Sequence, residues 1–429
     1  MENLIEFFSF SDSSVRYVAL GSVLLTASSA VVGTFTFLKK KALVGDAIAH
    51  AVLPGICLAF IISGSKNPVF LITGALITGW ISLVLIDFIT AKSKIKEDTA
   101  IALILATFFG VGVFLLTMIQ KSGNAAQSGL NSFLFGKAAS LVGSDLITFS
   151  VVAIILLITV LIFFKEFTII AFDSAYAKAL GLPVKKIEYL LTTLTVLAVV
   201  IGIQSVGVVL MAAMLITPAA AARYWTHKIK FMILLAAILG GFSGLTGAYI
   251  SFTAPSMPTG PWIVVVISTI AFFSFFFAPH KGIFYRLIRN YRFKTRMLKE
   301  NILKVFYQIG ERKNKIHTPL STEEILTWRN FEPEILQKGL RLLIRDGYLE
   351  KDTEGFHLTG EGIEKGQRTV KLHRLWEVYL TKYMHIAPDH VHEDAETIEH
   401  ILTPELEKKL EELLDYPEKD PHESEIPYR

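Results

Sequence analysis

Two side chains with metal-binding chemistry lie in the apolar stretch GDAIAHAVLPG, residues 45–55. Asp46 and His50 are four residues apart, so on a helix they share one face. A carboxylate with an imidazole is a ligand set that suits Mn, Fe or Zn. Because ionisable groups inside a membrane span are costly unless they are paired or face water, such a pair indicates a polar site in an ion pathway. The other interpretation is that Asp46 caps the helix and His50 hydrogen-bonds a neighbouring helix.

The elements that must position this pair are membrane spans. Of the 429 residues, 52% are hydrophobic, and long apolar runs fill residues 16–280, whereas residues 281–429 read like a soluble domain. Since about 20 apolar residues cross the hydrocarbon core, the sequence predicts about nine spans. They are 16–37, 43–63, 67–90, 98–119, 143–164, 186–203, 206–224, 230–252 and 261–279. Residues 186–224 form either two of these spans or one broken helix.

The basic residues of the short loops predict the orientation of the spans. With nine spans, all the basic clusters fall on one side, which the positive-inside rule makes the cytoplasm. These clusters are Lys39–Lys41, Lys92–Lys96, Lys165, Lys185–Lys186, Arg223–Lys230 and Lys281–Lys294. The N-terminus then lies outside, and the residues after the last span lie in the cytoplasm.

Several other classes of protein are disfavoured by the sequence. One cysteine, Cys57, excludes a disulfide framework and a cysteine-rich metal site. The first residues lack the basic start and small-residue cleavage site of a signal peptide, so the first apolar segment is expected to be a retained anchor. No G-x-x-x-x-G-K-[ST] motif is present, so the chain is not expected to hydrolyse ATP.

Three stretches carry a family resemblance. GDAIAHAVLPG resembles the second-helix signature of the permeases of zinc-, manganese- and iron-type ABC importers, and VGVVLMAAMLITPAAAARYW, residues 206–225, resembles a later motif of that family. FDSAYAKALGLPVKKIEYL, from Phe172, resembles the coupling helix that docks into the nucleotide-binding subunit. The resemblance covers nearly all of residues 10–280. It implies that Asp46 and His50 line the transport pathway and that Asp173, Ala177 and Gly181 belong to the coupling segment.

This resemblance implies a multi-pass permease in a bacterial cell membrane, with no enzymatic activity of its own. Its cargo would be a divalent transition metal, with manganese first and zinc or iron as alternatives. Its partners would be an ABC ATPase subunit, an extracytoplasmic metal-binding lipoprotein and a second permease subunit, identical or similar. Membrane lipid contacts the bundle. A proton-coupled secondary transporter is an alternative, which the coupling segment disfavours.

The pattern after residue 281 predicts a second fold. Residues 281–298 read as a basic linker helix that continues from the last span and contacts lipid headgroups. A helix over 299–310, a capping box from Ser321 to Glu324, and an amphipathic helix ending near Gly347 come next. A hairpin around Thr353–Gly355 and a helix start at Thr359 complete a winged-helix order over 299–370. The expected fold is therefore an all-α membrane bundle, residues 1–280, followed by this domain and a helical dimerisation-type region, 371–429.

The last region resembles the dimerisation region of diphtheria-toxin-repressor and manganese-repressor type regulators, on the stretches KLHRLWEVYL, DHVHEDAETIEHIL and DYPEKDPHESEIP. Glu396, Glu399 and His400 share one helix face, and the resemblance implies that they are primary-site metal ligands. It implies an ancillary site at His373, Glu377 and His392, and a further primary ligand at Glu300. The next ligand position, Leu303, departs from the pattern because it cannot bind metal. The other interpretation is a solvated acidic helix with ordinary salt bridges.

DNA binding by this second fold is disfavoured, because the helix that would enter the major groove opens with Glu332 and Glu334. A cytoplasmic metal-sensing domain that slows transport when metal is plentiful is the favoured hypothesis. The alternative is a membrane-tethered, metal-dependent transcription regulator, for which nine spans are more than an anchor needs.

Overall fold

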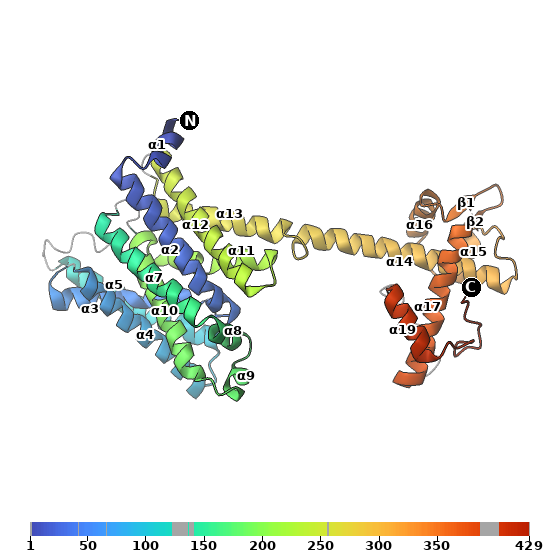
Figure 1. Ribbon diagram of the computed structural model, residues 1–429, viewed down its shortest axis with the longest axis horizontal. Helices are drawn as coiled ribbons and strands as arrows, with labels where there is room; N and C mark the ends of the chain where they lie inside the picture. Colours follow the sequence, from blue (N-terminus) through green and yellow to red (C-terminus); the bar gives the residue numbers. More distant parts are fainter. Residues whose placement is uncertain are drawn as a thin grey trace. The chain divides into compact units, whose positions relative to one another are not determined.

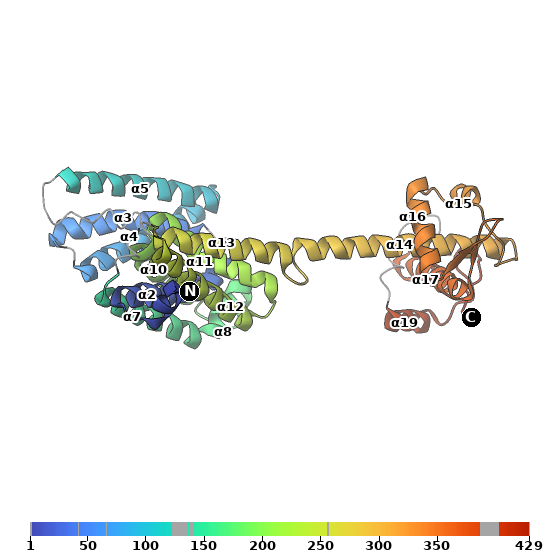
Figure 2. The same cartoon turned by 90° about the horizontal axis from the view of Figure 1, so that it is seen from above.

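The structure is a computed structural model that describes residues 2–41, 43–65, 67–121, 136, 141–254, 257–386 and 403–428. The chain divides into two compact units, Met1–Tyr285 and Arg286–Arg429. All the regular elements described in the first unit are helices, and the second unit has helices and one small hairpin (Figures 1 and 2).

Eight helices of the described chain are long and apolar enough to cross a membrane. They are α2 (Ser13–Leu38), α3 (Val44–Ser63), α4 (Pro68–Lys92), α5 (Glu97–Lys121), α7 (Gly143–Ile162), α10 (Val184–Val206), α12 (Ile229–Thr253) and α13 (Thr259–Phe277). Each of them overlaps a segment expected from the sequence. By length and composition, eight of the nine expected spans are therefore candidate membrane spans in the described chain.

The remaining expected span, 206–224, is a separate helix, α11 (Val208–Trp225), which is not among the eight. Gly207 separates it from α10 with φ 85° and ψ 167°, a backbone conformation that glycine adopts without steric cost. Residues 186–224 therefore form two helices rather than one broken helix. At 18 residues, with Pro218 inside it, α11 is the shortest of these apolar helices.

Helix α2 lies at the centre of the first unit because its backbone is approached closely by α11 and α12. A Cβ atom added at Gly33 would lie 1.8 Å from the Leu215 carbonyl oxygen of α11, so only glycine fits there. On α12, Gly240 and Gly244 are four residues apart and face the backbone of α2 in the same way. Small residues at this spacing let membrane helices pack closely, as the alanine- and glycine-rich sequence predicts.

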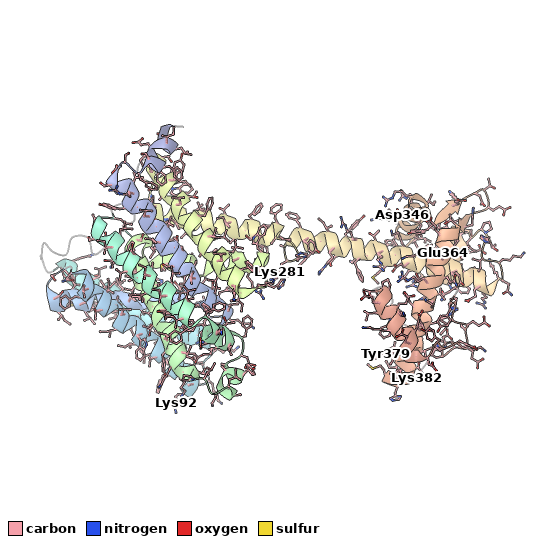
Figure 3. The ribbon with its side chains drawn as sticks, in the orientation of Figure 1. Lys92, Lys281, Asp346, Glu364, Tyr379 and Lys382 are labelled. Carbon is pink, nitrogen blue, oxygen red and sulfur yellow. The ribbon has the colours of Figure 1, made fainter. Side chains whose placement is uncertain are left out.

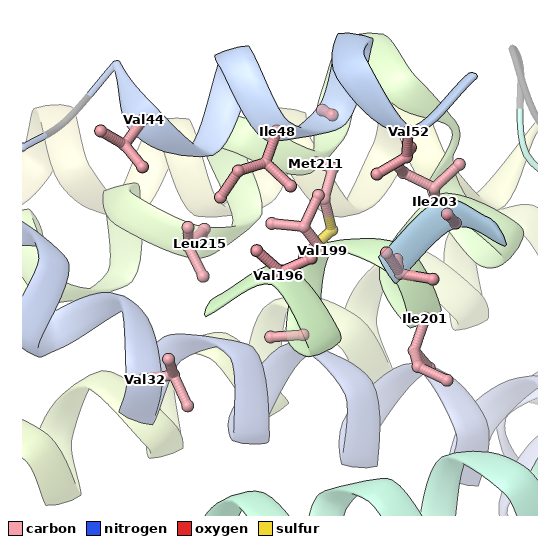
Figure 4. Packing of buried hydrophobic residues seen from close by; sticks show 14 of the residues in the cluster. Val32, Val44, Ile48, Val52, Val196, Val199, Ile201, Ile203, Met211 and Leu215 are labelled. Carbon is pink, nitrogen blue, oxygen red and sulfur yellow. The ribbon is translucent and has the colours of Figure 1, made fainter. Parts of the chain in front are cut away.

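Helix α3 packs through its apolar face against α10 and α11. Val44, Ile48 and Val52 of α3 lie together with buried side chains of the other two helices, including Val199 and Met211 (Figure 4). The face of α3 toward α5 is different: the thiol of Cys57, which is fully buried, lies 3.7 Å from the Gly112 carbonyl oxygen of α5. Both of the helices that come next in sequence, α4 and α5, contact α3 as well (Figure 2).

Of three short helices, α1 and α8 were not expected from the sequence, whereas α9 lies within the stretch that resembles a coupling helix. Helix α1 (Glu2–Ser9) packs Phe7 against Tyr249 and Phe252 of α12. Helix α8 (Phe164–Phe172) comes directly after α7, and α9 (Ser174–Ala179) leads toward α10.

The junction after α13 differs from the expected continuous helix. Helix α13 ends at Phe277, and α14 (Ile283–Arg312) begins after a short non-helical segment. Lys281 in that segment donates a hydrogen bond to the Arg223 carbonyl oxygen at the end of α11, at 2.8 Å (Figure 3). Beyond it, α14 is a single helix that includes both the expected basic linker and the expected 299–310 helix.

The second unit contains α14, α15 (Thr322–Trp328), α16 (Pro333–Arg345), strands β1 (Leu349–Lys351) and β2 (Phe356–Leu358), α17 (Gly360–Met384) and α19 (Pro404–Leu414). The expected capping box at Ser321 and Glu324 is confirmed, and Thr359 caps α17 as expected. The antiparallel strands pair Leu349 with Leu358 across the expected turn. A core of leucine, isoleucine, valine and phenylalanine side chains joins the C-terminal half of α14 to α15, α16 and the hairpin.

Helices α17 and α19 form the other half of the second unit. Leu375 of α17 packs against Leu410 and Leu414 of α19 and against Ile426. Trp376, Tyr379 and Tyr383 lie along one side of α17, with neighbouring ring centroids 5.0 and 5.4 Å apart (Tyr379 is labelled in Figure 3).

Candidate functional site

Asp46 and His50 lie on α3, one helical turn apart, as the spacing predicts. The His50 Nε2 atom is 3.4 Å from the Asp46 Oδ1 atom. The His50 side chain is 15% exposed and that of Asp46 is 37% exposed in the single chain. Asp46 is in the first turn of α3, but the residue before the helix, Leu43, makes no side-chain cap. Asp46 is therefore inside the helix and does not act as its N-cap.

The imidazole of His50 is held against α5 by an aromatic contact. The rings of His50 and Phe109 meet edge to face, with centroids 4.8 Å apart. Its second nitrogen, Nδ1, is buried and has no hydrogen-bond partner within the described part of the chain. The expected alternative, a hydrogen bond from His50 to a neighbouring helix, is therefore not formed there.

The distance between the two side chains fits two ligands of one ion. Ligands that bind at about 2.0–2.2 Å with a near-right angle between them stand about 3 Å apart. The 3.4 Å separation of His50 Nε2 and Asp46 Oδ1 is close to that value. A hard oxygen beside an imidazole nitrogen suits a divalent transition metal better than Ca²⁺ or Mg²⁺.

At the N-terminal end of α3, charged side chains surround a cavity of about 470 Å³. Lys39 at the end of α2 pairs with Glu188 of α10 at 2.6 Å, and Lys41 pairs with Glu97 of α5 at 3.2 Å. Lys41 also lies 3.8 Å from Asp87 of α4. In the sequence these lysines indicated only the orientation of the chain. Their pairing was missed because each partner is far away in sequence.

The three residues expected in the coupling segment lie on and around α9. The Asp173 carboxylate accepts a hydrogen bond from the Tyr176 amide at 2.8 Å and caps the helix. Ala177 is fully buried in the bundle core, and Gly181 has φ +80°, so it ends the segment with a left-handed turn. Tyr176 and Leu180 are 56% and 53% exposed, which leaves an apolar surface on the other side of α9.

Glu300 lies on the buried face of α14, where it is paired with cations. Its Oε1 atom is 2.9 Å from Arg296 Nε and 3.8 Å from Lys365 Nζ of α17. Leu303 belongs to the apolar core, and Lys304, which the sequence did not mark as a candidate, is only 1% exposed.

His373 and Glu377 lie together on α17, both almost completely buried. The His373 Nε2 atom is 3.1 Å from the Glu377 Oε1 atom, so this pair also fits two ligands of one ion. The other expected ligands, His392, Glu396, Glu399 and His400, lie outside the described residues. Across the described ranges, no group of three or more His, Cys, Asp or Glu side chains is arranged to hold a metal ion.

An ion-pair network on α17 was not predicted from the sequence. Arg374 pairs with both carboxylate oxygens of Glu311 on α14, at 2.6 and 3.0 Å, and lies 3.5 Å from Asp420. Burial alone would lower the pKa of Arg374, but its carboxylate partners raise it above the ordinary value. These partners are 46 and 63 positions away from Arg374 along the chain, so no local pattern shows their pairing.

A second network joins α17 to α19. Lys371 lies 2.7 Å from both Glu407 and Glu411, and Arg368 donates two hydrogen bonds to Glu407. Burial alone would raise the pKa of Glu407, but the hydrogen bonds from Lys371 and Arg368 hold it below the usual value.

A bundle of candidate membrane spans with a partly buried Asp–His pair and a short helix between two of the spans is typical of the membrane subunit of a transporter driven by a separate ATPase. Residues 11–278 match the ABC 3 transport family, and this chain belongs to that family. It is a transport subunit and not an enzyme, and it works with an ATPase and a substrate-binding protein. Residues 359–428 match the iron dependent repressor, metal binding and dimerisation domain.

Named relatives agree with this assignment. The manganese transport system membrane protein MntC of Bacillus subtilis is 44% identical over 375 residues, which cover 87% of this chain and 86% of that protein. The zinc transport system membrane protein TroC of Treponema pallidum is 40% identical over 66% of this chain and 95% of that protein. The structure of PsaBC from Streptococcus pneumoniae in complex with Fab superposes with a TM-score of 0.58 at 33% identity. The superposition covers 65% of this chain and 97% of the S. pneumoniae chain.

Proposed function

We propose that this chain imports a divalent transition metal, with manganese as the first candidate and zinc as the second, through a pathway that Asp46 and His50 line. The observation that carries the proposal is the Asp46–His50 pair inside a candidate span, with the imidazole oriented by Phe109. The relatives at 44% and 40% identity are named as manganese and zinc transport proteins, which favours these two metals over iron.

The orientation that this function requires places the second unit in the cytoplasm. Helix α11 contacts α2, α3, α10, α12 and α13, each of which is a candidate span, so we infer that it crosses with them as a ninth span. The exposed Tyr176 and Leu180 on α9 would then face the cytoplasmic ATPase. A second permease subunit, identical or similar, would complete the pathway beside the half-exposed Asp46.

Metal uptake by the assembled transporter tests the pathway residues. Cells that express the whole transporter with Asp46→Ala or His50→Ala are expected to lose at least about tenfold of their manganese uptake, measured with ⁵⁴Mn. Asp98→Asn and His227→Ala are matched controls, because these side chains are exposed and lie in the first turn of α5 and in the loop before α12. Full uptake by both α3 variants, at wild-type protein levels in the membrane, would refute the assignment.

We interpret the second unit as a regulatory domain with a winged-helix order over 299–370 and a dimerisation-type region over 371–429, joined to the bundle by the basic segment 281–298. The buried His373–Glu377 pair and the match of residues 359–428 to a metal-binding domain support a regulatory metal site. Glu332 and Glu334 at the start of α16 oppose DNA binding, since they would face phosphates. Deletion of residues 286–429 is expected to leave uptake intact and remove its inhibition by cytoplasmic manganese. Unchanged inhibition would exclude this role.

A further inference from the structure

The buried face of α14 carries a lysine beside the expected ligand position. Glu300, Leu303, Lys304 and Tyr307 are spaced as one helix face, and all four are less than a tenth exposed. This face packs on α17, because a Cβ atom added at Gly366 would lie 3.0 Å from the Leu303 carbonyl oxygen. It is the same α17 that carries His373 and Glu377 farther along.

Of the two ligand positions expected on α14, one cannot bind metal and the other is already paired with cations. Leu303 has no ligand atom, and it is 1% exposed in the apolar core. Glu300 already lies beside Arg296 and Lys365. Those two cations are partly exposed, at 53% and 33% of their side chains, so they have room to move away from an incoming ion.

Lys304 has no such freedom. Its side chain is among the largest that are fully buried in the described chain, at 1% exposure. A lysine is almost never fully buried unless its charge is compensated, so the Lys304 ammonium belongs to the interior of the folded domain. A divalent cation bound at Glu300, one helical turn away, would have to share this poorly solvated helix face with the lysine charge, which is unfavourable.

We propose that Lys304 takes the place of a metal ion on the α14 side of the second unit, so that this unit binds divalent metal only on its His373–Glu377 side. On the α14 side, the primary site that the resemblance implies then holds the charges of Glu300 and Lys304 in place of a metal ion. The contact of α14 with α17 is formed whether or not metal is present. The assignment of metal to the His373–Glu377 side rests on the proposed regulatory metal site, whereas the role of Lys304 does not.

Manganese binding by the purified full chain in nanodiscs tests this proposal. The background is Asp46→Ala with His50→Ala, which removes the transport pair, and bound Mn(II) is counted by mass spectrometry after gel filtration. We expect one Mn per chain, lost in Glu377→Gln and retained with an affinity within about twofold in Glu300→Gln. Two Mn per chain, or loss of the bound Mn in Glu300→Gln, would overturn the proposal. No bound Mn would leave the role of Lys304 standing and refute the site at His373 and Glu377.

Two gain-of-binding variants test the effect of the Lys304 charge by itself. Leu303→Glu supplies the missing carboxylate but keeps Lys304, and we expect it still to bind one Mn per chain. Leu303→Glu with Lys304→Met removes the charge as well and is expected to bind a second Mn at least about a hundredfold more tightly than Leu303→Glu alone. Leu303→Glu with Lys338→Met is the matched control, because Lys338 is exposed on α16. A second Mn in Leu303→Glu alone would refute the role of Lys304, and the Glu300→Gln result does not depend on these variants folding.

Discussion

Arg374→Met is expected to loosen the C-terminal segment from α17 and α14. The Arg374 side chain is 8% exposed, pairs with Glu311 through two hydrogen bonds, and also donates to the Glu425 carbonyl oxygen. Removing one partner of a buried ion pair costs about 3–5 kcal/mol. The low end, about 3 kcal/mol, applies here because Glu311 is 37% exposed and water can solvate it after the substitution. Asp420 keeps its hydrogen bonds from the His422 and Ser424 amides, which also limits the cost.

Hydrogen exchange of the full chain measures this effect. The amides of Asp420 and Ile426 donate backbone hydrogen bonds within the C-terminal segment, and in Arg374→Met they are expected to exchange about a hundredfold faster. Arg312→Met is the matched control, because Arg312 is exposed over the Trp328 ring and its loss should cost no more than about 0.5 kcal/mol. Equal exchange in the two variants would show that the Arg374 network does not hold the segment.

Two further predictions concern the α17–α19 ion pairs and the close contact of α2 with α11. The lowered pKa of Glu407 means that its ionised form stabilises the fold above its usual pKa of about 4.5, and this contribution is lost as the pH falls through the lower folded-state pKa. Glu407→Gln is therefore expected to destabilise the pairing with Lys371 at pH 7, and hydrogen exchange of α19 measures this loss. The difference in exchange between the variant and wild type should shrink below about pH 4.5. A difference that does not depend on pH would contradict this prediction. Gly33→Val is expected to prevent folding of the bundle, since even a Cβ atom there would lie 1.8 Å from the Leu215 carbonyl oxygen. The control Gly110→Ala should be neutral, because a Cβ atom at Gly110 meets nothing within 4 Å. Fluorescence-detected gel filtration compares the two variants. Monodisperse Gly33→Val at wild-type yield would refute the close helix contact.

The membrane helices were predictable because their signal is local. Each long apolar run between charged loops corresponds to a helix, and the 43–63 segment that carries Asp46 and His50 is α3 (Val44–Ser63). Whether residues 186–224 form one helix or two was not predictable, because composition does not tell whether Gly207 bends a helix or ends it. The contact of Phe7 with α12 was missed for another reason, since a short amphipathic helix has no long apolar run to mark it.

The candidate site residues show the same limit. Spacing placed Asp46 beside His50, and the family resemblance placed His373 with Glu377; both pairs are four residues apart on one helix. Spacing alone did not show that Arg296 and Lys365 surround Glu300, since Lys365 comes from a different helix.

The burial of Cys57 has a consequence for oxidation chemistry and for labelling. It is the single cysteine of the chain, and its side chain is fully buried, with the thiol next to the Gly112 carbonyl oxygen of α5. An oxidant or an alkylating reagent in solution therefore meets no accessible thiol on the folded protein. A cysteine introduced at an exposed position, such as Lys338 on α16, would be the only reactive thiol, so a spin label or fluorophore placed there would report on that position alone.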